Sequence, residues 1–215
     1  QMINASALDN GLHAGDLKFV DLDGNNKIEQ TTSANDRKDM KVIGNSLPRY
    51  NYNFGISADW YGIDFSVLFQ GIGKQNWYPG AETSMFWGPY SRPYASFIPS
   101  DFMSQVWSEE NTDAYFPRPR GYVALGSNRE LAVVNTKYLQ NLAYCRLKNL
   151  SIGYTLPNKW LSKIGFEKIR VYFSGENLLT FTKLHSDYID PEQASASNSW
   201  KTSKSDANIY PWAKT

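Results

Sequence analysis

Cysteine, histidine and net charge are all scarce in this chain of 215 residues. Cys145 is the single cysteine, which excludes an internal disulfide framework and leaves the redox compartment open. The two histidines, His13 and His185, lie far apart in the sequence, and no serine or cysteine nucleophile elbow, zinc-ligand spacing or phosphate-binding glycine loop accompanies them. The net charge of +1 gives no electrostatic basis for binding nucleic acid. We therefore expect neither an enzyme nor a nucleic-acid-binding protein.

A long apolar run is missing as well. No run of about 18 apolar residues occurs, so no helical membrane span is predicted. Residues 1–11 lack a basic segment followed by an apolar core, so no secretory signal peptide is expected there. Aromatic residues are instead abundant at 15% of the chain, with seven tryptophans and fourteen tyrosines, which is rich for a soluble domain.

The stretch from 48 to 73 carries the clearest pattern in the chain. Apolar and polar side chains alternate on both sides of a tight corner at 59–62. Because alternate side chains of a strand point to opposite faces, this pattern predicts a β-hairpin with one apolar and one polar face. The apolar side chains are Tyr50, Tyr52, Phe54, Ile56, Ala58, Ile63, Phe65, Val67 and Phe69. The polar side chains include Asn51, Asn53, Ser57, Asp64 and Gln70.

Two environments suit such a hairpin. In a soluble β-sandwich that binds carbohydrate through its aromatic residues, the apolar face would pack on a second sheet. In a transmembrane β-barrel, the apolar face would meet lipid and the polar face would line the lumen. Each arm has about ten residues, which is the length that a tilted strand needs to cross a bilayer. Aromatic residues also occur at both ends of the apolar band, as they do at membrane interfaces.

The rest of the chain favours the transmembrane barrel over the sandwich. Residues 144–182 predict two more strands, Tyr144–Leu156 and Lys168–Asn177, joined by a short helical turn that ends at Gly165. Val171 falls on the apolar row of the second strand, and its polar row includes Arg170 and Glu176. The remaining segments, 1–47, 74–143 and 183–215, are predicted as long loops, with a helix starting at Ser100 that places Met103, Val106 and Trp107 on one face, and a fifth strand beginning at 209.

Long and short connections thus alternate, as in an up-and-down barrel that has long external loops and short periplasmic turns. We therefore predict an all-β fold of antiparallel, up-and-down strands from a transmembrane β-barrel. The soluble sandwich remains the alternative.

Aromatic and acidic residues of the loops are candidate ligand-binding groups. The aromatic candidates are Trp77, Tyr78, Trp87 and Tyr90. Exposed rings at these positions would stack on sugars, whereas buried rings would pack the loop against itself. The acidic residues Asp187, Asp190 and Glu192 are close enough in sequence to act as paired carboxylates, although solvated loop acids are far commoner.

A candidate calcium loop begins at Asp21. Carboxylate and amide side chains occur at loop positions 1, 3 and 5, where a turning backbone brings its oxygens onto one cation. The candidate ligands are Asp21, Asp23, Asn25, the backbone carbonyl of Lys27, and Asp36. Gly24 stands at the fourth position rather than the sixth, and Thr32 replaces the carboxylate expected at the twelfth, so Asp36 or Asp39 would have to supply the missing oxygens. The alternative is an Asp/Asn/Gly turn that satisfies its own backbone.

Several motifs occur in a fixed order along nearly the whole chain. They are GDLKFVDLDGNNKI (15–28), VIGNSLPRYNYNFGISADWYGIDFSVLFQGIGKQNWY (42–78), VWSEENTDAYFPR (106–118), YLQNLAYCRLKNLSIGYTLP (138–157), IRVYFSGENLLTFTK (169–183) and DYIDPE (187–192). Together they resemble the C-terminal end of the SusC/RagA class of TonB-dependent outer-membrane transporters. The chain departs from that class at Asn26, where the class usually has glycine, and at Thr215, where the class usually ends a last strand in an aromatic residue.

The resemblance implies an outer-membrane barrel of about 22 strands around an N-terminal plug in a Gram-negative bacterium. It implies the import of oligosaccharides or peptides, powered through the TonB complex, with a SusD-like surface lipoprotein as a lid. The expected partners are therefore the rest of the barrel and its plug, the lipoprotein, the TonB complex, the glycan or peptide substrate and the lipid bilayer. No cofactor is expected apart from the possible calcium ion. Four strands do not close a barrel, so the chain is not expected to transport alone.

Overall fold

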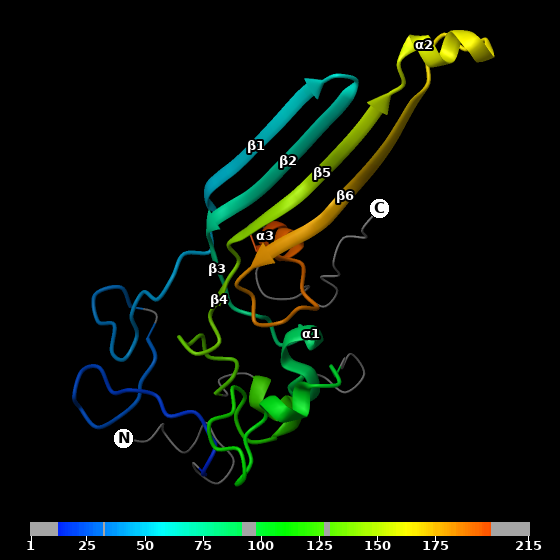
Figure 1. Cartoon of the computed structure of the whole chain (residues 1–215). Coiled ribbons are helices and arrows are strands. Elements are labelled where there is room, and N and C mark those ends of the chain that lie inside the picture. Colours follow the sequence, from blue (N-terminus) through cyan, green and yellow to red (C-terminus); the bar gives the residue numbers. More distant parts are fainter. Residues whose placement is uncertain (1–12, 32, 92–97, 127–129, 199–215) are drawn as a thin grey trace. The chain divides into compact units, whose positions relative to one another are not determined.

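The computed structural model describes residues 13–31, 33–91, 98–126 and 130–198 (Figure 1). The chain divides into two compact units. The first unit contains the described residues up to 44 and those from 78 to 139, and the second contains those from 45 to 77 and from 140 to 198. No helix in these ranges is long and apolar enough to cross a membrane.

The second unit is built on a four-stranded antiparallel sheet. Its strands are β1 (Arg49–Trp60), β2 (Ile63–Lys74), β5 (Tyr144–Thr155) and β6 (Arg170–Thr182), and they lie in the order β1-β2-β5-β6. Each strand therefore pairs with the next long strand along the chain (Figure 1), and the predicted all-β, up-and-down arrangement is confirmed. The strands β3 (Asn76–Trp77) and β4 (Gln140–Asn141) form a separate small ladder.

The corner between β1 and β2 is a two-residue turn. Trp60 pairs directly with Ile63, and the residues between them, Tyr61 and Gly62, have φ angles of 47° and 86°. Positive φ at both central residues is the hallmark of a type I′ turn, whose twist matches that of the strands it joins. The predicted tight corner therefore has the geometry that sets the register of the hairpin.

That register places the predicted apolar side chains in cross-strand rows. One row runs across all four strands through Ala58, Phe65, Ile152 and Phe173, and another through Trp60, Ile63, Tyr154 and Val171. The rings of Phe54 and Phe69, which face each other across β1 and β2, stack with centroids 5.0 Å apart. Alternation along each strand, visible in the sequence, thus becomes a continuous apolar face of the sheet.

The last strand is longer than the alternation suggests. It begins at Arg170 rather than Lys168 and runs to Thr182 rather than to Asn177. A register shift opposite Leu147 and Asn149, with Asn177 at a φ angle of 53°, allows the strand to continue with its alternation reset. A bulge of this kind interrupts the pattern of side chains without ending the hydrogen-bonded ladder.

The connection between β5 and β6 contains helix α2 (Asn158–Leu161) and the 3₁₀ turn η6 (Ser162–Ile164). Gly165 ends them with a φ angle of 77°, which is the predicted helix stop. After β6, the predicted loop contains a helix that the sequence pattern missed, α3 (Pro191–Asn198). Its residues are mostly small and polar, so the sequence has no apolar periodicity that would predict this helix. The predicted fifth strand from residue 209 lies outside the described residues.

The first unit has no long strand in its described part and is held together by aromatic rings. Its short helices are α1 (Ser84–Trp87), η2 (Gly88–Tyr90), η4 (Phe102–Gln105) and η5 (Gly121–Leu125). The rings buried between them belong to Phe86, Trp87, Tyr90, Phe102, Phe116 and Tyr138. Phe102 and Phe116 stack with centroids 4.6 Å apart, and Phe86 meets Trp87 edge to face at 4.8 Å.

The helix predicted from Ser100 is only the single turn η4, and its predicted face is wrong. Val106 is buried, but Met103 is exposed. The reason is local: Val106 has extended backbone angles, φ −96° and ψ 136°, and bridges to Phe116 instead of continuing a helix. Helical spacing therefore does not apply to this segment.

Candidate functional site

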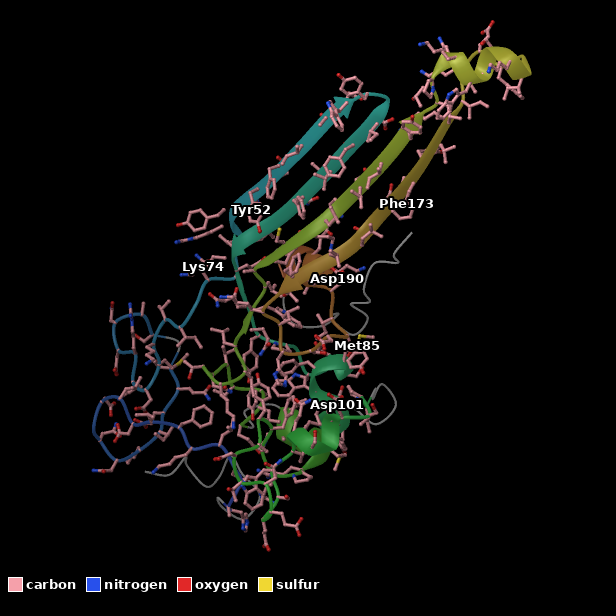
Figure 2. All side chains as sticks on the ribbon, viewed as in Figure 1. Tyr52, Lys74, Met85, Asp101, Phe173 and Asp190 are labelled. Carbon is pink, nitrogen blue, oxygen red and sulfur yellow. The ribbon has the colours of Figure 1, made fainter. Side chains whose placement is uncertain are left out.

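The apolar face of the sheet is open. Ile56, Val171 and Phe173 are 60%, 64% and 59% exposed, and Phe54 and Trp60 are exposed too. Phe173 is labelled on β6 in Figure 2. Leaving large apolar side chains in water forgoes about 25 cal/mol for each Å² of apolar surface that burial would remove from water. A contiguous apolar face of this kind indicates an apolar environment or partner.

The opposite face of the sheet is polar. One row on it consists of four serines, Ser57, Ser66, Ser151 and Ser174, each directly opposite the next. Asn53 lies opposite Gln70, and Asn149 opposite Glu176, so the predicted polar residues share this face. The two faces of one sheet thus have opposite chemistry over the same strands.

An ion pair crosses a strand on this polar face. The Arg170 Nε–H donates to Asp64 Oδ1 at 2.9 Å, and a second guanidinium N–H donates to Asp64 Oδ2. Gly153 lies beneath the pair, and a Cβ there would sit 2.5 Å from Asp64 Oδ1 and 2.6 Å from the Arg170 guanidinium. The missing side chain of Gly153 therefore lets a β2 carboxylate and a β6 guanidinium meet over β5.

A second charged cluster is buried on the sheet. The side chains of Arg146 and Asp190 are only 2% and 3% exposed and form an ion pair. Arg146 also donates to Glu192 Oε2 at 2.8 Å and to Thr180 Oγ1 at 3.0 Å, and Lys148 donates to the same Glu192 oxygen at 3.0 Å. These bonds tie the segment that carries α3 to strands β5 and β6.

Asp190, which is labelled in Figure 2, has a second task in this cluster. Its Oδ1 accepts the backbone N–H groups of Glu192 at 2.9 Å and of Gln193 at 3.2 Å, which caps the start of α3. Asp190 and Glu192 therefore bind basic side chains, and Asp190 also binds helix N–H groups. The expectation that they are solvated loop acids is wrong for Asp190, because Arg146, distant in sequence, covers it.

The calcium candidates of the first unit come together only in part. Carboxylate oxygens of Asp21, Asp23 and Asp39 lie within 4.8 Å of one another. Asp36, the predicted last ligand, instead has its Oδ2 3.4 Å from Lys38 Nζ. Asp39 replaces it because the chain returns to the loop at that residue: the N–H groups of Leu22 and Glu29 donate to the Asp39 carboxylate at 2.6 and 2.8 Å.

The same carboxylates also satisfy the backbone. Asp21 accepts N–H groups from Gly24 at 2.6 Å and from Asn26 at 2.8 Å, and Asn25 Oδ1 accepts the N–H of Lys27 at 2.8 Å. Although desolvation opposes ionisation of Asp21, these backbone hydrogen bonds lower its pKa below the ordinary value. The donor set, three carboxylates, fits a hard cation, and the bonds are equally those of a self-satisfied turn.

Three of the four aromatic candidates for ligand binding are interior residues, and Tyr78 is half-buried. Trp77, Trp87 and Tyr90 are 2%, 0% and 1% exposed. The hydroxyl groups of Tyr78 and Tyr90 donate to the carbonyl oxygens of Leu131 at 2.8 Å and of Pro117 at 2.5 Å, and burial raises the pKa of both tyrosines. Trp77, Trp87 and Tyr90 thus follow the packing alternative, and none of the three offers an open ring face to a sugar.

Two known proteins are similar in sequence to this chain over most of its length. No family model matches the sequence. TonB-dependent receptor P3 of Formosa agariphila is 34% identical over 176 residues, which are 81% of this chain and 15% of that receptor. The chain belongs to the TonB-dependent receptor family. TonB-dependent receptor P26 of the same organism is 27% identical over 192 residues, 88% of this chain and 17% of the receptor. The chain thus spans about one sixth of the length of these relatives.

Solved structures of a RagAB peptide importer are also similar to the chain. The 'open-open' state matches with a TM-score of 0.47 at 23% identity, covering 76% of this chain and 16% of that one. A further structure of the RagAB peptide transporter matches with a TM-score of 0.49 at the same identity, covering 76% of this chain and 17% of that one.

Proposed function

We propose that the chain forms adjacent strands in the wall of an outer-membrane transporter of the SusC/RagA class. One observation carries this proposal: a four-stranded sheet whose exposed apolar face backs directly onto a polar, ion-paired face, in a chain of the TonB-dependent receptor family. The apolar face would meet lipid, and the polar face would line the lumen.

The dimensions of the sheet support this assignment. Strands of 12 and 13 residues extend about 40 Å at about 3.3 Å per residue. Tilted by about 45°, as transmembrane strands are, such a strand spans about 30 Å, which is the thickness of a bilayer hydrocarbon core. A soluble sandwich would need a second sheet over Ile56 and Phe173, and the described chain leaves both exposed.

The family resemblance supports a proposal for the activity of the whole receptor. Four strands leave two open edges, which the remaining strands of a large barrel would pair. Import of oligosaccharides or peptides would then depend on the rest of the barrel and its plug, on TonB coupling and on a SusD-like lipoprotein lid. Calcium at Asp21, Asp23 and Asp39 would brace the loop of the first unit.

Fractionation of the source cells tests the proposal. An antibody raised against residues 74–143 should detect a band much larger than 24.5 kDa in the outer-membrane fraction, and its mobility should shift when the sample is heated in SDS. A soluble band at 24.5 kDa would contradict the proposal, because an open four-stranded sheet would then exist without lipid.

A further inference from the structure

The short connection between β5 and β6 holds apolar side chains away from the protein. Trp160, Ile164 and Phe166 are 62%, 62% and 58% exposed, although the segment is only a helical turn with a glycine stop. Leu161 alone among its larger side chains is buried, and it anchors the turn from inside. Three large apolar side chains on the outside of so short a segment need an apolar environment.

Hydrogen bonds hold the turn in this conformation. The Trp160 N–H donates to the Pro157 carbonyl at 3.0 Å, and the Phe166 N–H donates to the Leu161 carbonyl at 3.2 Å. At its base, the Leu156 N–H donates to the Ile169 carbonyl at 3.0 Å, which keeps the two flanking strands together. The exposed side chains therefore project from a defined turn.

The turn carries an excess of positive charge. Residues 157–168 contain Lys159, Lys163 and Lys168, all exposed, against the single acid Glu167. Lys159 and Lys163 lie within the helical part of the turn, in α2 and η6. Apolar side chains and lysines thus share one short surface.

This surface lies at one end of the sheet, directly beyond the last paired residues of β5 and β6. The turn between β1 and β2 and helix α2 lie at the same end of the sheet (Figure 1). At that end the last apolar row is Trp60, Ile63, Tyr154 and Val171, and Trp60 and the turn residue Tyr61 are exposed. An apolar band therefore ends in aromatic rings, and lysines follow immediately beyond it.

We propose that the turn 157–168 is an interfacial anchor that seats in the headgroup layer of a bilayer containing anionic phospholipid. Aromatic rings prefer the level of the headgroups, and lysines extend their charge to the lipid phosphates while their stems stay in apolar surroundings. The inference rests on the proposed function, since it needs the apolar face of the sheet in lipid. Its occupant is the lipid surface and not a protein, because the turn joins two strands whose apolar face would already lie in the bilayer.

The test places a fluorophore at single cysteines in the whole receptor that carries the chain, with Cys145→Ser and any other cysteine removed. Bimane is attached at Ser162→Cys in the turn, at Phe173→Cys on the apolar face, or at Ser174→Cys on the polar face. Each protein is reconstituted in phosphatidylcholine alone or with phosphatidylglycerol. Quenching is measured with spin labels on the lipid headgroup or in the acyl chain.

The proposal expects headgroup quenching at position 162 that is stronger when phosphatidylglycerol is present. Because one lysine near an anionic surface is worth about a fivefold change in binding, the K159Q/K163Q variant should lose most of this preference. The matched variant K18Q/K41Q, which removes two exposed lysines from the first unit, should keep it. Acyl-chain quenching is expected at position 173 and not at position 174.

Other outcomes separate the two proposals. Acyl-chain quenching at 173 without headgroup quenching at 162 would overturn the anchor and leave the barrel wall intact. Equal quenching at 162 in both lipid mixtures would overturn the preference for anionic lipid and with it the anchor. Absence of quenching at both 162 and 173 would overturn the proposed function itself.

Discussion

The two units of the chain treat the same residue types in opposite ways. In the first unit, Trp87 and Phe116 are fully enclosed by other rings. In the second, Phe173 and Trp60 stand exposed on a regular sheet. Water favours burial of both sets equally, so the difference indicates two surroundings: the first unit supplies its own apolar interior, and the sheet requires an external one.

The comparison also explains why the first unit needs no long strand. Its rings meet edge to face or stacked, as Phe116 and Tyr138 do with centroids 5.9 Å apart. Aromatic pairs of this geometry add about 0.5–1.5 kcal/mol beyond the area they bury. A loop rich in proline and aromatic residues is thereby ordered by side chains rather than by a backbone ladder.

The largest expected effect breaks the core of the first unit. Trp87→Ala should lower its stability by about 3–5 kcal/mol, because the substitution leaves a cavity among packed rings. Trp60→Ala, at an exposed tryptophan of the sheet, should leave that unit unchanged. Near-ultraviolet circular dichroism during denaturation and limited proteolysis of 78–139 measure the stability of the first unit in both variants. Equal losses of stability in the two variants would contradict the comparison.

The next effect concerns the buried charges of the second unit. Asp190→Asn retains a side chain able to cap α3 but leaves the Arg146 guanidinium without its buried counter-charge. Removing one partner of a buried ion pair destabilises a protein by about 3–5 kcal/mol. The loss should be smaller here, because Glu192 still pairs with Arg146. The variant should release the segment 183–198 from the sheet, and limited proteolysis measures that release.

The matched control is Asp187→Asn, at an exposed acid of the same segment, which should have little effect. If both variants release the segment to the same extent, the ion pair does not hold it.

A third prediction sharpens the contrast between the two faces of the sheet. Phe54→Arg should hinder membrane insertion by about 2–4 kcal/mol if its position lies near mid-bilayer, whereas Asn53→Arg on the neighbouring polar position should be tolerated. Folding of the receptor into lipid vesicles at several denaturant concentrations gives both values. If arginine is tolerated equally at the two positions, the assignment of one face to lipid and the other to the lumen is wrong.

The smallest effect lies in the acidic loop of the first unit. The pKa of Asp21 is lowered in the folded chain, so its contribution to stability is present above the unfolded pKa of about 3.9 and is lost as pH falls through the folded value. The amide resonances of Gly24 and Asn26 should therefore shift in acid. Asp21→Asn should abolish that shift, and calcium should move it to lower pH if the ion binds the carboxylate.

Much of the sheet follows directly from the sequence. The alternation in 48–73 indicates both strands, their faces and the corner at Tyr61 and Gly62, because a strand has a fixed period of two and the corner needs positive φ angles. The extension of β6 to Thr182 is not predicted by alternation, because a bulge shifts the alternation by one residue while the backbone hydrogen bonds continue.

The candidate sites follow less well. Asp21 and Asp23 are neighbours in sequence, and their spacing alone indicates a shared turn. The choice of Asp39 over Asp36 depends on where the chain returns, as do the burial of Trp87 and the capture of Asp190 by Arg146, 44 residues away. The pattern of residue types indicates whether a side chain favours an apolar or a polar environment. It does not indicate which residue, distant in sequence, contacts that side chain in the folded protein.

The sequence by itself determined the strand pattern, the two-faced chemistry of the sheet and the family, because each is written in local alternation or in ordered motifs. Only the tertiary structure decided that Gly153 lets Asp64 reach Arg170 and that Asp190 is buried. It also decided that Trp87 and Phe116 of the loop face inward while Trp60 and Phe173 of the sheet face outward. The physical reason is that alternation acts between neighbours along the chain, whereas burial and ion pairing depend on segments that only folding brings together.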